Sequence, residues 1–93
     1  MFVHLVIHHP RPGKEQPLVD SMHKFGEAMR GRPGLQQVYT LRDQTTGTLV
    51  GLATWDSEED WRAARPAMLE AVKDDNLDDV DEQPPEVYHL EVV

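Results

Sequence analysis

The first eight positions place apolar side chains on both faces of an extended strand. They fall on alternate sides, with Val3, Leu5 and Ile7 on one face and Phe2 and Val6 on the other. Pro10 follows closely and cannot continue a strand interior. We therefore predict a strand over residues 2–8, and a strand that is apolar on both faces is central in its sheet or covered on both sides.

The next apolar positions recur with helical spacing. They form one stripe at i, i+4, i+7 and i+11, made of Leu18, Met22, Phe25 and Met29. Pro17 is tolerated only in a first turn, so the helix begins between residues 14 and 17. Gly31 ends it, and Pro33–Gly34 forms a turn.

Two further strands and a second helix follow. Residues 35–42 and 48–55 predict a hairpin around the turn 43–47. Ser57 is the expected N-cap of the second helix, with Asp60 in the reciprocal capping position. The inner stripe of this helix consists of Trp61, Ala64, Met68 and Ala71 or Val72. Pro66 is expected to kink the helix or to start a second segment.

The remaining chain predicts an acidic loop and a last strand. Residues 73–82 are rich in Asp and Glu, Pro84–Pro85 follows, and residues 86–93 read as a strand. The order βαββαβ predicts one α+β domain over residues 1–93, a ferredoxin-like four-stranded antiparallel sheet with both helices on one face. The other face would expose the apolar side of the first strand, which predicts a homodimer through that sheet face.

Composition narrows the function classes. The chain has 93 residues, no cysteine and a net charge of −8. The missing cysteines make the cytoplasm the default location, and the apolar start is too short for a membrane span. Phosphate backbones repel an acidic protein without a basic stripe, so we expect no nucleic-acid partner. Residues 48–54 also lack the aromatic and basic side chains of an RNA-binding sheet.

Histidines are the first candidates for chemistry. His4 and His8 share a strand face with Val6, and an imidazole in an interior cavity could accept a proton from a phenol or an enol. The alternative is a structural histidine that is hydrogen-bonded within the sheet. The two lie about 13 Å apart along a strand, too far to share one metal ion. A metal would need His89 as well, so we predict no metal site.

Aromatic side chains suggest a pocket for a small organic molecule. The predicted binding residues are Phe25, Tyr39, Trp55, Trp61 and Met68. Tyr39 would orient the ligand through its hydroxyl, and the two tryptophans would form walls. The alternative is that these residues form an ordinary core. Arg62 and Arg65 are expected on the outer face of the second helix, and the acidic run lacks the glycine of a calcium loop.

Three segments together resemble the antibiotic biosynthesis monooxygenase (ABM) family. They are Arg11-Pro12-Gly13-Lys14-Glu15, Arg32-Pro33-Gly34-Leu35 and Trp55-Asp56-Ser57-Glu58-Glu59-Asp60-Trp61. The resemblance covers nearly the whole chain. It implies a dimeric α/β barrel, in which two sheets close into one barrel with the helices outside.

The resemblance also bears on activity. Some members oxygenate polyketide anthrones without metal or flavin, where the substrate anion reduces oxygen and the protein supplies a base. Others degrade haem with an Asn, a Trp and a His, but Val6 stands where that Asn would fall and no histidine lies between His23 and His89. The expected function is a cofactor-independent monooxygenase acting on a small aromatic or enolisable substrate. The alternative is a non-enzymatic dimeric domain that binds a small molecule.

Overall fold

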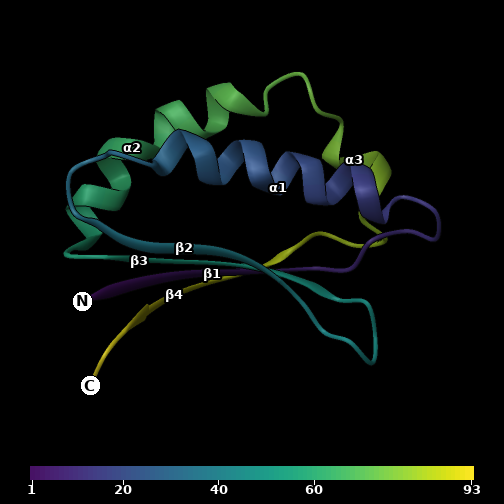
Figure 1. The fold of residues 1–93 in the computed structure, drawn as a ribbon, viewed down its shortest axis with the longest axis horizontal. Helices are drawn as coiled ribbons and strands as arrows, with labels where there is room; N and C mark the ends of the chain where they lie inside the picture. Colours follow the sequence, from purple (N-terminus) through teal and green to yellow (C-terminus); the bar gives the residue numbers. More distant parts are fainter.

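Four antiparallel strands form one sheet, and the helices all lie on one side of it (Figure 1). The computed structural model describes residues 1–93, except the side chain of Leu77. The strands are β1 (Phe2–His8), β2 (Leu35–Arg42), β3 (Leu49–Trp55) and β4 (Glu86–Glu91). The helices are α1 (Glu15–Met29), α2 (Glu58–Ala71) and the short α3 (Leu77–Val80). The strand order β2-β3-β1-β4 makes β1 central and confirms the predicted ferredoxin-like fold.

The acidic segment differs from the prediction. It was expected to be a loop, but it contains the helix α3. The side chain of Asn76 donates a hydrogen bond to Asp79 Oδ2 at 2.8 Å, and the backbone N–H of Asp79 donates to the Asn76 carbonyl at 3.1 Å. These two bonds close a helical turn that a count of charged residues does not reveal.

The register of β1 assigns each side chain to a face. Phe2, His4 and His8 are buried and point toward the helices. His4 lies between Ala53 of β3 and His89 of β4. The intervening residues, Val3, Leu5 and Ile7, point to the opposite face, which no described helix covers (Figure 1).

The uncovered face of the sheet is apolar across all four strands. Alternation along each strand places there Val3, Leu5 and Ile7 of β1, Val50 and Leu52 of β3, Tyr39 and Leu41 of β2, and Tyr88 and Leu90 of β4. The four residues on the two edge strands are between 43% and 49% exposed. The expectation that one face of the sheet stays open and apolar is therefore confirmed for the single chain.

The covered face holds the main core. Its buried members are Phe2, Met29, Ala53, Trp55, Trp61, Ala64 and Met68. Helix α2 runs through Pro66 without a break, so no second segment begins there. The proline leaves the carbonyl of Arg62 without its usual helical donor.

The start of α2 is fixed by a cap and by a close approach to a turn. The backbone N–H of Asp60 donates to Ser57 Oγ at 3.2 Å, and the Ser57 hydroxyl donates to Asp60 Oδ2 at 3.0 Å. Gly34 adopts φ +86°, and a Cβ there would overlap the Asp60 side chain. The N–H of Asp56 also donates to the Gly34 carbonyl at 2.8 Å, which joins this turn to the chain entering α2.

Substituting Gly34 tests this contact. We expect Gly34→Ala to destabilise the fold more than Gly47→Ala, which has a similar φ of +78° but open space around the added Cβ. The control variant Gly47→Ala should lose about 1–2 kcal/mol of the free energy of unfolding from backbone strain alone. Gly34→Ala should lose at least about 1 kcal/mol more, because Asp60 must leave its cap position. Urea unfolding measures both values, and equal losses would contradict the role assigned to Asp60.

Candidate functional site

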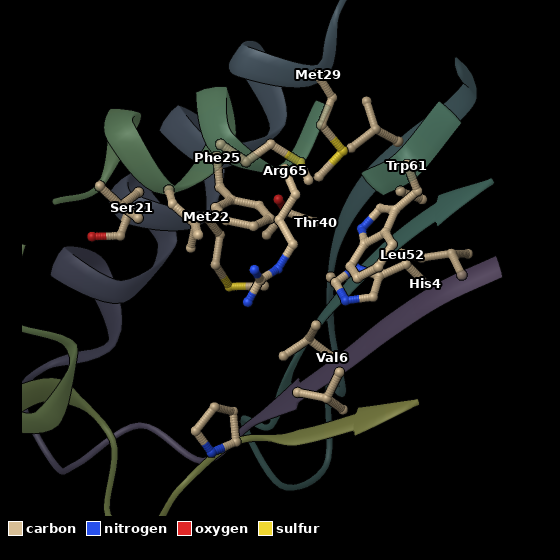
Figure 2. Close-up of a pocket in the computed structure, with 18 of the residues that line it drawn as sticks. His4, Val6, Ser21, Met22, Phe25, Met29, Thr40, Leu52, Trp61 and Arg65 are labelled. Carbon is tan, nitrogen blue, oxygen red and sulfur yellow. The ribbon is translucent and has the colours of Figure 1, made fainter. Parts of the chain in front are cut away.

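A cavity of about 770 Å³ lies between the helices and the covered face of the sheet. Figure 2 shows side chains from α1 on one side of it and from β1 on the other. Most of the wall is apolar and includes Val6, Met22, Phe25, Met68 and Val87. Its volume falls within the range of small-molecule sites, so an interior space with a histidine in its wall is present as predicted.

One end of the cavity is formed by a cluster of aromatic and imidazole rings. The ring centroid of Trp61 lies 4.8 Å from that of His4, 4.7 Å from that of His89 and 5.5 Å from that of Phe2. The rings of His4 and His89 are 5.4 Å apart, because the β1–β4 register pairs these two residues directly. The indole N–H of Trp61 is buried and has no acceptor among the described residues.

His4 is held neutral by its surroundings. It is 7% exposed, and burial lowers the pKa of its imidazole to about 4, with further lowering from His89 and from the positive charge of Arg65. At neutral pH the ring therefore carries no charge and is a weak base. It serves as a polar wall that can donate or accept one hydrogen bond.

His8 sits in a different environment at the other end of β1. Its Nδ1 lies 2.9 Å from Asp81 Oδ2, and both side chains are buried. A carboxylate only accepts hydrogen bonds, so Nδ1 is the donor of this pair, and in the neutral form of the ring the lone pair lies on Nε2. His8 also lines the cavity, and its Nε2 has no partner among the side chains described. A histidine oriented by a buried carboxylate is the usual arrangement of a general base.

The segment that carries Asp81 is joined to β1 by backbone contacts. Pro10 and Asp81 form an isolated antiparallel bridge, the N–H of Glu82 donates to the His9 carbonyl at 2.8 Å, and the N–H of Arg11 donates to the Val80 carbonyl at 2.7 Å. These bonds fix Asp81 beside His8 across 73 residues of sequence. No pattern in the sequence indicates this pair, because Asp81 stands among many acidic residues.

The structure separates the predicted binding residues into two groups. Phe25, Trp61 and Met68 line the cavity, as do both candidate histidines. Trp55 is fully buried in the core cluster and is not part of the wall. Tyr39 borders the cavity through its strand, but its side chain belongs to the uncovered face and is 49% exposed. Its neighbour Val38 packs against Gly26 of α1, and side chains alternate along a strand.

Arg65 is exposed, as expected for a charge on the outer side of the helix, but it also has a place at the cavity that was not predicted. It lines the cavity, and Figure 2 shows its guanidinium in the space between the helices and β1. The signal was present in the sequence, because Arg65 follows Trp61 by four residues and so shares its helix face. Arg62 also borders the cavity, but its guanidinium is bound to Glu58 at 2.7 Å.

No three His, Asp or Glu side chains among the described residues lie close enough together to hold a metal ion. The helices that the structure describes are too short or too polar to cross a membrane.

Solved structures with this fold provide a comparison. Rv0793 from Mycobacterium tuberculosis superposes with a TM-score of 0.85 at 17% identity, over 99% of this chain and 94% of that one. A protein named antibiotic biosynthesis monooxygenase gives 0.80 at 16% identity, over 100% and 99% of the two chains. A protein from Caulobacter crescentus, provisionally named an antibiotic biosynthesis monooxygenase, gives 0.82 at 14% identity, over 99% and 89%.

These likenesses establish the fold and include proteins named for the ABM family that the sequence resembles. At the level of sequence, no family model and no curated protein matches this chain.

The depressed pKa of His4 makes stability depend on pH. The folded state keeps His4 neutral down to about pH 4, whereas the unfolded chain takes up a proton near its ordinary value of 6.5. The contribution of neutral His4 to the free energy of unfolding is therefore complete above pH 6.5 and is lost as the pH falls toward 4. Between about pH 7.5 and about pH 4.5 we expect His4 to account for a loss of about 2.5 kcal/mol.

Urea unfolding of the wild type and of His4→Gln at both pH values measures this loss. All other groups titrate in both proteins, so the difference between the two changes in the free energy of unfolding is the contribution of His4. Protein concentration must be the same throughout. An NMR titration of the His4 ring in the folded wild type gives the pKa directly. A ring that titrates at an ordinary histidine pKa would contradict the prediction, even if the variant does not fold.

Proposed function

We propose that this chain is a cofactor-independent monooxygenase that acts on a small aromatic or enolisable substrate. The observation that carries the proposal is the pair of His8 and Asp81 in the wall of an apolar cavity, with an Nδ1–Oδ2 distance of 2.9 Å. The fold that this chain shares with proteins named antibiotic biosynthesis monooxygenase agrees with it.

His8 is the proposed base. Asp81 holds the ring in the tautomer whose Nε2 accepts a proton, and it stabilises the imidazolium that forms. The acidic C–H of a substrate lies beside a carbonyl or within a phenol-like ring system, and its proton passes to Nε2. His4 is poorly suited to this task, because its pKa of about 4 makes it a weak base at neutral pH.

The remaining reaction takes place between the substrate anion and dioxygen. The anion gives one electron to O₂, and the two radicals combine to form a carbon–oxygen bond. The resulting peroxide takes up a proton. Removal of the second hydrogen from the same carbon then breaks the O–O bond, so that a CH₂ group and O₂ yield a carbonyl group and water. The apolar walls exclude water from the anion, which would otherwise be reprotonated.

The proposed partner of the chain is a second copy bound through the uncovered face of the sheet. That face presents apolar side chains from all four strands, while the net charge of −8 lies mostly elsewhere on the molecule. A two-fold axis through β1 would place the same surface on both subunits, which is the usual geometry of a homodimer. Closure of two such sheets gives the dimeric α/β barrel that the family resemblance implies.

Substitution of His8 tests the enzymatic proposal. We expect the wild type to oxidise anthrones faster than the uncatalysed reaction, measured by oxygen uptake and by the absorbance of the quinone product. His8→Ala should lose at least about 100-fold in turnover, the usual contribution of a general base. His4→Ala should lose less, because its imidazole positions the substrate without taking the proton.

His23→Ala is the matched control, since His23 is an exposed histidine of α1 and should leave turnover unchanged. Equal turnover in the wild type and His8→Ala would rule out the base. If the wild type binds these compounds, with NMR shifts at the cavity residues, and does not oxidise them, the chain is the non-enzymatic binding domain instead.

Light scattering with size-exclusion chromatography tests the dimer. We expect the wild type to have twice the mass of the 10.6 kDa chain. The double variant Leu41→Asp with Leu90→Asp should be a folded monomer, because both side chains are exposed on the uncovered face and add charge to it. Ala63→Asp places the same charge on the exposed side of α2 and should remain dimeric. A wild type that stays monomeric at high concentration would contradict the pairing.

A further inference from the structure

Carboxylates are excluded from the cavity of an otherwise acidic protein. The chain has 17 Asp and Glu residues, yet none is among the residues lining the cavity. The charged residues of that lining are Arg62 and Arg65, and the lining also includes three histidines. The lining therefore differs from the rest of the chain, whose net charge is −8.

Arg65 is the cation of the cavity lining that has no carboxylate partner in the described part of the chain, whereas the other one, Arg62, is paired with Glu58. The described salt bridges of Lys and Arg join Lys24 to Asp75, Arg30 to Glu27, Arg42 to Glu15, Arg62 to Glu58 and Lys73 to Glu70. Arg65 forms none within the described part of the chain. Its neighbours at helical spacing are Trp61, Arg62, Met68 and Leu69, so α2 itself offers it no anion.

The guanidinium of Arg65 is directed at the space where a ligand would lie. Figure 2 shows it between Met22 and Phe25 of α1 and the ring of His4 on β1. Its charge reaches that ring, because it contributes to the lowered pKa of His4. Arg65 itself is exposed to solvent, so an incoming ligand can reach it without movement of the backbone.

We propose that the cavity selects ligands that combine an apolar ring system with one anionic oxygen group, and that this group pairs with Arg65. The rings would occupy the apolar part of the wall, and the planar guanidinium would bind a carboxylate through two parallel hydrogen bonds. An enolate or phenolate oxygen has the same charge and would take one of these bonds. This inference rests on the proposed function, since it names the substrate class of the same cavity.

The test compares three probes of similar size, namely 2-naphthoate, 2-naphthalenemethanol and 2-naphthylmethylammonium. Isothermal titration calorimetry gives the Kd of each, and NMR shifts of the His4 and Trp61 rings show whether binding occurs in the cavity. We expect 2-naphthoate to bind the wild type at least about 10-fold more tightly than the alcohol, the usual size of one hydrogen bond to a charged group. The ammonium probe should bind most weakly.

Variants assign this preference to one residue. Arg65→Gln should bind the carboxylate and the alcohol equally, and Arg65→Lys should recover part of the preference because it restores the charge without the planar fork. Arg30→Gln is the matched control, since it removes the same charge from an exposed site just after α1 and should keep the full preference. Loss of the preference in Arg30→Gln as well would show an effect of net charge and overturn the role of Arg65.

The outcomes also separate this inference from the proposed function. If the three probes bind the cavity equally, or the ammonium probe binds best, the anion preference is wrong, while oxidation of a neutral anthrone by the wild type can still stand. If none of the probes shifts the His4 and Trp61 signals, the cavity is not a site for aromatic ligands, and both proposals fail together.

Discussion

The alternation of side chains along β1 is the constraint on which the rest of the structure depends. One face of this central strand carries Phe2, His4 and His8 toward the helices, and the other carries Val3, Leu5 and Ile7 away from them. The cavity follows from the neighbours of the first face. Val6 is paired with Gly51 and His4 with Ala53, so β3 offers little side-chain volume beneath the helices. Larger residues at these two positions would fill the space that α1 and α2 enclose.

Periodicity was sufficient to predict the elements of the fold, because each element has one dominant pattern. The stripe from Leu18 to Met29 defines α1, and the two-faced apolar strand over residues 2–8 correctly placed β1 in the middle of the sheet. The predictions for the site were less accurate where they depended on which face of the sheet a side chain of a strand points to. A bulge between Leu35 and Gln37 shifts the register of β2, and Tyr39 therefore lies on the uncovered face. Trp55 ends β3 beside Phe2, where the core is closed.

Other parts of the site depend on contacts that no local pattern contains. Asp81 meets His8 only because backbone bonds join its segment to the residues after β1, and these bonds connect positions about seventy apart in the chain. His89 reaches Trp61 and His4 through the pairing of β4 with β1. Arg65 is the exception, because its distance of four residues from Trp61 was visible in the sequence. The prediction was incomplete there, because it placed Arg65 in solvent, where it is exposed, without considering that its helix phase also brings it to the cavity.

The two faces of the sheet also explain how so small a chain can contain so large a space. A cavity of about 770 Å³ removes packing contacts from a protein whose core is already limited by its 93 residues. The uncovered face offers apolar area that a second copy would bury, and this burial would offset the loss. Pairing through the sheet leaves the cavity on the opposite side, next to the helices. In such an assembly the apolar contacts on one face of the sheet stabilise the fold, and the ligand binds on the other face. The cavity residues that would contact the ligand are the neutral His4, the oriented His8 and the unpaired Arg65.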